Sequence, residues 1–162
     1  MTRRPFLNIL TGLGLGTAAS KAAMAASTPT RADRVQMTDA EWKKRLPDSA
    51  YRVLRDEGTE PPHSSVLNNE KRVGAFHCAG CDLALFASTA KYESGTGWPS
   101  FFAPLPDAVA TKTDYKMILP RTEYHCARCG GHQGHVFNDG PRPTGQRYCN
   151  NGVALRFAPA AA

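Results

Sequence analysis

Two pairs of cysteines constrain the fold of this chain more than any other feature of its sequence. Cys78 and Cys81 form one CxxC pair, and Cys126 and Cys129 form the other. A CxxC turn directs two thiolates at one ion at about 2.3 Å, and two turns complete a tetrahedral site that is closed and therefore structural. The 44 residues between the pairs exceed the roughly 15–20 of a compact zinc ribbon. The spacing therefore predicts a structural zinc site that clamps two distant hairpins of one domain.

The first 25 residues are typical of an export signal. Arg3 and Arg4 precede Phe6 and Leu7, an apolar run follows over 9–19, and small residues end the segment at 23–25. This order of charged, apolar and small residues marks export, and the paired arginines resemble a twin-arginine signal. A membrane anchor is the alternative, but a membrane span needs about 20 apolar residues. We therefore expect a periplasmic protein without stable membrane insertion, with a signal over 1–25, a linker over 26–36 and one domain over 37–158.

Export makes the alternatives to zinc more plausible than they are in a cytoplasmic protein. Disulfides persist in oxidising compartments, and a redox-active CxxC is a second alternative. Gly80 lies inside the first cysteine pair, while Gly130 and Gly131 follow the second. Glycines suit tight turns that leave backbone N–H groups free to face sulfur. They favour the zinc interpretation.

Composition places the chain among small globular proteins with short elements. Its 162 residues correspond to roughly one domain, and 14 glycines and 12 prolines favour turns and short strands. Half of the net charge of +6 comes from residues 1–25, and the rest is scattered. A weak and scattered charge argues against nucleic acid as a partner.

Local signals predict two short helices that lead into an antiparallel sheet domain. Thr38 and Glu41 form a capping-box pattern, so one helix should begin there and end before Pro47. Asp48 is the predicted cap of a second helix that runs through Arg55. β-type runs over 72–78, 115–119 and 153–157 indicate strands, the last of them near the end of the chain.

Cys149 is the one cysteine without a CxxC partner. Arg147 lies two residues upstream, and His135 and His132 lie 14 and 17 residues upstream. On a strand Arg147 would share the side of Cys149, and a nearby cation lowers the pKa of a thiol. A thiolate with imidazole nearby is the usual basis of a cysteine nucleophile. A buried inert cysteine and an intermolecular disulfide remain alternatives.

Four motifs in this order and spacing closely resemble the B-type methionine sulfoxide reductases, in addition to the CxxC pairs. They occupy residues 95–101, 134–137, 139–141 and 147–149. The similarity runs from about Thr38 to Phe157. It implies a mainly β fold of two antiparallel sheets, a zinc-clamped tent or pseudo-barrel. It also implies reduction of the R epimer of methionine sulfoxide in oxidised proteins and peptides. Separately from the resemblance, we expect the protein to be a monomer.

The resemblance also implies roles for individual residues. Cys149 would attack the sulfoxide sulfur and become a sulfenic acid, with His132 and His135 as proton donors and Asn151 near the sulfoxide oxygen. Trp98 would form the wall against the substrate's methyl group, since sulfur–aromatic contacts contribute roughly 0.3–1.5 kcal/mol. The remaining expected roles are orientation of the histidines and water by Asp139 and Arg147, and packing near the pocket by Phe137. His63, His77 and His125 receive no role.

Three residues depart from the family pattern. Thr96 stands where many members carry a resolving cysteine, and no cysteine is left for that role once four bind zinc. We therefore expect a thioredoxin-like protein or a small thiol to reduce Cys149 directly. Asn150 replaces an apolar residue, and Gly152 replaces a serine. Both put rate and substrate preference in doubt, but not the type of reaction.

Two non-enzymatic interpretations compete with this one. The same zinc-clamped β fold can hold a ligand without chemistry, and a zinc ribbon can contact nucleic acid. The combination of Cys149, His135 and Asn151 argues against a pure binding module, because such a module needs no activated thiol. The long gap between the CxxC pairs and the modest charge argue against a nucleic-acid module.

Overall fold

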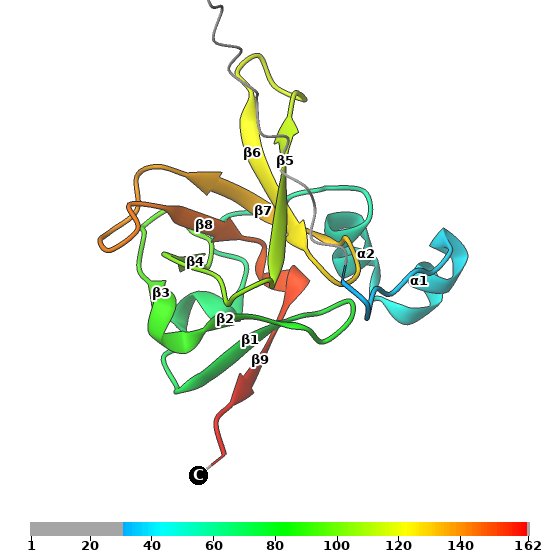
Figure 1. The fold of residues 1–162 in the computed structure, drawn as a ribbon, viewed down its shortest axis with the longest axis horizontal. Coiled ribbons are helices and arrows are strands. Elements are labelled where there is room, and N and C mark those ends of the chain that lie inside the picture. The colour runs from blue at the N-terminus through cyan, green and yellow to red at the C-terminus, as the bar shows by residue number, and fades with distance from the viewer. Residues whose placement is uncertain (1–30, 162) are drawn as a thin grey trace, which may run out of the picture.

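The computed structural model describes residues 31–161 of the chain. The segment 1–25, with its predicted export signal, lies outside the described residues. Residues 31–161 form two antiparallel sheets and two short α-helices (Figure 1). The prediction of a mainly β fold with two N-terminal helices is therefore confirmed.

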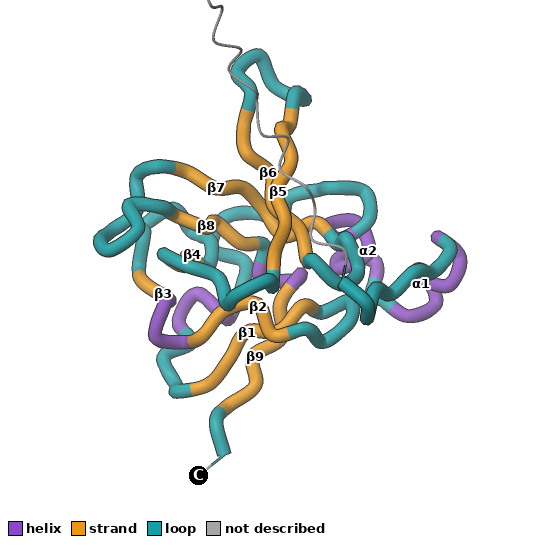
Figure 2. The backbone as a smooth tube through the Cα atoms, in the orientation of Figure 1, coloured by secondary structure: helices purple, strands orange, loops and turns teal. Residues whose placement is uncertain are grey.

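The elements are short and separated by long loops (Figure 2). The α-helices are α1 (Asp39–Arg45) and α2 (Asp48–Leu54). Single helical turns occupy η1 (Val66–Asn69), η2 (Ser88–Ala90) and η3 (Gly152–Ala154). The strands are β1 (Gly74–Cys78), β2 (Ala84–Ala87), β3 (Lys91–Tyr92), β4 (Ser100–Phe101), β5 (Val109–Asp114), β6 (Arg121–Cys126), β7 (His132–Phe137), β8 (Arg147–Asn150) and β9 (Leu155–Pro159).

The start of α1 is the predicted capping box. The Thr38 N–H donates to Glu41 Oε2 at 2.7 Å, and Thr38 Oγ1 accepts from the Glu41 N–H at 3.3 Å. The prediction that Asp48 caps α2 is wrong, because Pro47 holds that position and Asp48 is the first helical residue. An acidic residue in the first turn of a helix is favoured by the positive end of the helix dipole. Neither helix has the length and apolar composition needed to cross a bilayer.

The two sheets share one core. A three-stranded sheet has the order β2-β1-β9, and a six-stranded sheet has the order β3-β4-β8-β7-β6-β5. Across the described residues both sheets keep free edges, so the tent does not close into a barrel. Phe76 and Phe86 of the smaller sheet pack on Phe101 of the larger one, with ring centroids 4.9 and 4.1 Å away. Tyr124 packs edge-on against Phe86, which extends the aromatic layer under β6.

Two of the three predicted strands exist, with altered bounds. The run 72–78 contains β1, and 153–157 overlaps η3 and β9. The strand predicted over 115–119 is wrong, because these residues form the loop at the projecting tip of the β5–β6 hairpin (Figure 1). The Lys116 N–H donates to Asp114 Oδ1 at 2.9 Å, and such a side-chain turn ends the strand despite the apolar sequence.

Candidate active site and metal site

The two CxxC pairs converge on one buried cluster. The four sulfur atoms lie within 4.8 Å of one another and could hold a metal ion. The separation is 3.6 Å between Cys78 and Cys129 and 3.5 Å between Cys81 and Cys126. A tetrahedron with bonds of about 2.3 Å has sulfur separations of about 3.8 Å, whereas a disulfide needs about 2.05 Å. The geometry fits a metal ion better than two disulfides.

Strand ends and glycines bring the four cysteines together. Cys78 ends β1 in the smaller sheet and Cys126 ends β6 in the larger one, so the cluster joins the two sheets. Gly130 has a φ of +69°, which suits glycine. A Cβ on Gly131 would lie 2.9 Å from Leu54 Cδ2 and 3.3 Å from Cys129 Sγ. The close approach of Leu54 shows that α2 packs against this cluster.

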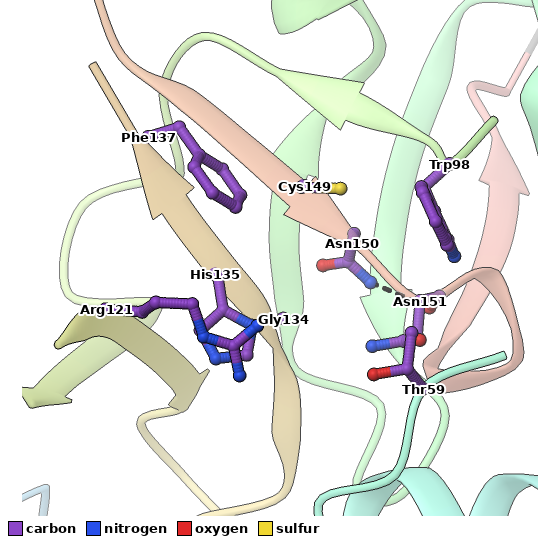
Figure 3. A pocket seen from close by; sticks show the side chains of 9 residues that line it. All are labelled: Thr59, Trp98, Arg121, Gly134, His135, Phe137, Cys149, Asn150 and Asn151. Carbon is purple, nitrogen blue, oxygen red and sulfur yellow. Dashed lines mark hydrogen bonds between the residues drawn. The ribbon is translucent and has the colours of Figure 1, made fainter. Parts of the chain in front are cut away.

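Cys149 lies in β8 beside a cavity of about 130 Å³. In the sheet register it is opposite His135 of β7 on one side and Ser100 of β4 on the other. Figure 3 shows the Cys149 sulfur directed toward Trp98. The residues that line the cavity are Thr59, Trp98, Arg121, Gly134, His135, Phe137, Cys149, Asn150 and Asn151.

The close packing of β7 on β8 depends on Gly134. A Cβ on Gly134 would lie 1.9 Å from the carbonyl oxygen of Cys149. No larger residue fits without displacing the strand that carries Cys149. The glycine between the two histidines of the motif is therefore required for close approach of the backbones.

Burial raises the pKa of the Cys149 thiol, although Arg147 and a hydrogen bond with Thr96 oppose the shift. The sequence-based prediction of a lowered pKa is therefore wrong in direction. Arg147 donates two hydrogen bonds of 2.8 Å to Asp139, and this carboxylate counteracts the effect of the cation on the thiol. The two-residue spacing of Arg147 and Cys149 in the sequence does not reveal that Asp139 already pairs with the Arg147 guanidinium.

Arg147, Asp139 and Phe137 form one side of the site. The Arg147 guanidinium lies 4.2 Å from the centroid of the Phe137 ring and keeps the pKa of Asp139 below its usual range. The sequence led us to expect that Arg147 and Asp139 orient the histidines. Their side-chain hydrogen bonds instead join them to each other.

Each motif histidine of β7 is paired with a carboxylate, His132 with one from the adjacent strand β6 and His135 with one from β5, the strand beyond it. His135 Nε2 donates to Asp114 Oδ2 at 2.8 Å, and Arg121 donates to the same oxygen at 2.7 Å. His132 Nδ1 donates to Glu123 Oε1 at 2.7 Å. The two imidazole centroids are 5.5 Å apart, but only His135 lines the cavity.

The environments of these groups set their protonation. Burial lowers the pKa of His135, against the opposing effect of Asp114, so His135 is mainly neutral near pH 7. Burial disfavours the Glu123 carboxylate, but hydrogen bonds from His125 and His132 prevail and lower its pKa to about 2. His132 is 2% exposed, and its Nε2 has no hydrogen-bond partner among residues 31–161. It therefore lies behind His135 rather than at the cavity surface.

Hydrogen bonds hold the side chain of Asn151, the second residue after Cys149, from two sides. Asn151 Oδ1 accepts from the Glu60 N–H at 2.9 Å, and its Nδ2 donates to the Gln133 carbonyl at 3.0 Å. Trp98 Nε1 donates to the Glu60 carbonyl at 3.1 Å, which links both sides of the cavity. A Cβ on Gly152 would lie 1.9 Å from Ser65 Oγ, so the departure from the family pattern at Gly152 matches a lack of space.

We expect the rate of alkylation of Cys149 by iodoacetamide to increase with pH, with a midpoint above the value of about 8.5 for an ordinary cysteine. Only the thiolate reacts, and the raised pKa moves the thiolate to higher pH. Arg147→Met removes an opposing cation and should move the midpoint further up, whereas Arg147→Lys should keep most of the wild-type profile. Timed labelling with mass spectrometry of the Cys149 peptide measures the rates. A wild-type midpoint at or below about 8.5 would contradict the assignment.

Comparisons with known proteins agree with this geometry. A family model described as the SelR domain matches residues 46–159. The peptide methionine sulfoxide reductase MsrB of Leptospira interrogans is 50% identical over 124 residues, which cover 76% of this chain and 95% of the relative. The Pseudomonas putida MsrB is 49% identical over 127 residues, 78% of this chain and 96% of the relative. The Methanosarcina barkeri MsrB is 50% identical over 124 residues, 76% of this chain and 87% of the relative.

Proposed function

Because this chain belongs to the SelR-domain family of B-type peptide methionine sulfoxide reductases, we propose that it reduces the R epimer of methionine sulfoxide in oxidised proteins and peptides. The observation that carries the proposal is the half-buried Cys149, which lines a cavity together with Trp98 and His135. A small cavity with one thiol, one imidazole and aromatic walls suits the end of a methionine side chain.

The reaction needs only the thiol and the sulfoxide to reach the sulfenic acid. Cys149 Sγ attacks the sulfoxide sulfur and forms a transient S–S bond. The oxygen then moves to Sγ, so that a bond forms between Sγ and the oxygen while the S–S bond and the sulfoxide S–O bond break. The thiol sulfur is oxidised, the substrate sulfur is reduced to a thioether, and the thiol proton ends on the sulfenic acid. The raised pKa keeps this proton on Cys149 until the substrate binds.

Neighbouring side chains would assist at defined positions. Trp98 would face the substrate's methyl group, as sulfur–aromatic contacts favour, and Phe137 would complete the apolar wall. His135 would take the thiol proton of Cys149 and pass it to the oxygen as the oxygen leaves the substrate sulfur. Such proton transfer typically accelerates a reaction about 10²–10⁴-fold. His132 would support His135 from behind. Asn151 uses one amide N–H on Gln133, and its second would bind the sulfoxide oxygen.

Recycling of the sulfenic acid would use an external thiol. The chain has five cysteines, and four of them belong to the buried cluster. Thr96 stands at the position of a resolving cysteine in many members and is near enough to the Cys149 thiol to oppose the rise of its pKa. A thioredoxin-like protein or a small thiol would attack the sulfenic acid and release water.

We expect oxidised wild-type protein to carry a dimedone adduct at Cys149 and no internal disulfide, because no partner thiol is available. Thr96→Cys places a thiol within reach of Cys149, so this variant should form the internal disulfide and lose the dimedone adduct. Thr96→Ser is the matched control and should behave as the wild type does. Peptide mapping of all three proteins under non-reducing conditions measures the products. An internal Cys149 disulfide in the wild-type protein would contradict external recycling.

The buried cysteine cluster would hold structural zinc. All four donors are sulfur, which suits zinc, and four protein ligands leave no open position for catalysis. Bound zinc would hold the two sheets together and supply no chemistry to the cavity.

We further propose export to the periplasm by the twin-arginine signal in residues 1–25. Fusions of this segment to a reporter protein, with and without Arg3→Lys and Arg4→Lys, would test the proposal by the amount of reporter that reaches the periplasm.

The experiment that tests the function is dithiothreitol-driven reduction of two peptides that differ only in the epimer of methionine sulfoxide. Turnover of the R epimer alone supports the proposal. Turnover of neither epimer by folded, zinc-loaded protein would favour a β-fold module that binds a ligand without chemistry.

A further inference from the structure

A buried glutamine connects the metal cluster to the active site. Gln133 lies in β7 and is completely buried. Its Nε2 donates to the sulfur of Cys78 at 3.5 Å, and its Oε1 accepts from Asn150 Nδ2 at 3.3 Å. Its side chain therefore joins a cysteine of the cluster to the residue that follows Cys149.

The backbone of Gln133 also holds the next residue of the active site. The Gln133 carbonyl accepts from the backbone N–H of Asn151 at 2.9 Å and from Asn151 Nδ2 at 3.0 Å. Asn151 lines the cavity beside Cys149. A displacement of Gln133 would thus move Asn150 and Asn151 together, and with them the end of the strand that carries Cys149.

The hydrogen bonds of this buried chain all run in one direction. The Tyr124 hydroxyl donates to Asn150 Oδ1 at 2.5 Å, Asn150 Nδ2 donates to Gln133 Oε1, and Gln133 Nε2 donates to Cys78 Sγ. Tyr124 and Asn150 are fully buried, so water does not substitute for a lost partner, and an unmade bond is costly. At the far end Gln133 Nε2 has two acceptors, Cys78 Sγ and the Gly131 carbonyl, each at 3.5 Å.

With a metal bound, Cys78 is the charged one of these two acceptors. The metal binds the thiolate, which carries no proton and accepts hydrogen bonds only. A free thiol is a neutral and weaker acceptor, so without metal Gln133 Nε2 would depend mainly on the Gly131 carbonyl. Hydrogen bonds to charged acceptors are roughly twice as strong as neutral ones, so metal binding at Cys78 favours the observed orientation of Gln133.

We propose that Gln133 is a positioning residue that makes the geometry of the Cys149–Asn151 segment depend on metal binding at the cysteine cluster. The inference rests on the proposed function, because it concerns the reactivity of Cys149. It extends that function because the structural metal would then influence the active site as well as hold the two sheets together. It also gives a reason for the polar residue at Asn150, where the family usually has an apolar one.

The test compares Gln133→Leu with the wild-type zinc-loaded protein. Leucine fills a similar volume but neither donates to Cys78 nor accepts from Asn150. We expect zinc release to a chromogenic chelator to accelerate about 10-fold, as loss of an outer partner of a metal ligand typically does. We also expect the alkylation rate of Cys149 to change and kcat on the R-epimer peptide to fall about 10-fold at unchanged KM, since small misplacements of reacting groups have such effects.

Two further variants separate positioning from packing. Gln133→Leu with Asn150→Leu also removes the unpaired Asn150 amide, although the Tyr124 hydroxyl then loses its acceptor. Stability should therefore recover in part, while zinc release stays fast and kcat stays low. Tyr124→Phe removes only the first bond of the chain and leaves the bond to Cys78, so its zinc release should remain that of the wild type. The double variant also keeps the test available if Gln133→Leu alone does not fold.

The outcomes are distinct from those that test the reductase activity. Wild-type zinc release and Cys149 alkylation in Gln133→Leu would overturn the coupling, whatever the substrate is. A double variant that recovers kcat together with stability would also overturn it, because Gln133 would then only fill space. Absence of turnover in the wild-type protein would reject the proposed function, while zinc release and alkylation would still decide the coupling.

Discussion

Replacing Cys149 by Ser is expected to abolish reduction of the R-epimer peptide and to leave the fold and the zinc content unchanged. A hydroxyl is a far weaker nucleophile toward sulfur than a thiol, and it cannot form a sulfenic acid. Removal of a nucleophile lowers kcat by up to about 10⁶-fold in other enzymes, so turnover should fall at least about 10⁴-fold. Dithiothreitol-driven turnover, measured separately for each epimer by chromatography of the peptides, tests the prediction.

The structure shows why this variant should report on chemistry alone. Cys149 is half-buried in β8 and lies outside the cluster of four cysteines. Serine differs from cysteine by one atom and keeps the strand register opposite His135. Zinc content and melting temperature are the controls. Residual turnover within about 10-fold of the wild type would show that another group carries the reaction and would remove the basis for the proposed mechanism.

Motifs with a local cause were predicted well from the sequence. The capping box at Thr38 depends on residues within one turn. The two CxxC pairs are distant in the sequence, but they converge on one buried cluster, as a tetrahedral site for one ion requires. The strand expected over 115–119 failed for a non-local reason. Its apolar residues would favour a strand in a core, but they lie at a hairpin tip where Ile118 is fully exposed.

The residues of the site that sequence reasoning missed come from the two strands that follow the motif strand across the sheet. Glu123 of β6 reaches His132 because β6 pairs with β7, and Asp114 of β5 reaches His135 across β6. No spacing in the sequence reveals such pairing. One signal was present, because Glu123 directly precedes the buried Tyr124 in a strand that leads to a CxxC pair, and a carboxylate buried there needs a partner.

The direction of the Cys149 pKa shift was missed for the same reason. Proximity of Arg147 in the sequence predicts a lowered pKa, but burial and the pairing of Arg147 with Asp139 are tertiary properties. A protonated thiol is nonetheless compatible with the reaction, because the sulfenic acid needs the proton. The raised pKa also protects Cys149 from unspecific oxidation, since oxidants react with the thiolate.

Replacing Cys126 by Ser is expected to prevent stable folding, a larger effect on stability than that of any other single substitution considered for this chain. Structural zinc contributes an apparent free energy of about 10–16 kcal/mol to folding in small zinc domains, whereas a typical domain is stable by about 5–15 kcal/mol in total. Loss of one of four ligands should therefore leave too little stability for a cooperative native state. Zinc per chain by elemental analysis and the thermal melt by circular dichroism measure the effect.

The position of the cluster explains why the loss should spread through the domain. Cys78 ends a strand of the smaller sheet, and Cys126 ends a strand of the larger one. In addition to the aromatic core, the cysteine cluster connects the two sheets directly, and α2 packs over it through Leu54. Cys149→Ser is the matched control, because it removes a sulfur outside the cluster. A Cys126→Ser protein that melts cooperatively within a few degrees of the wild type would show that the sheets hold together without the metal, and the coupling through Gln133 would then lose its cause.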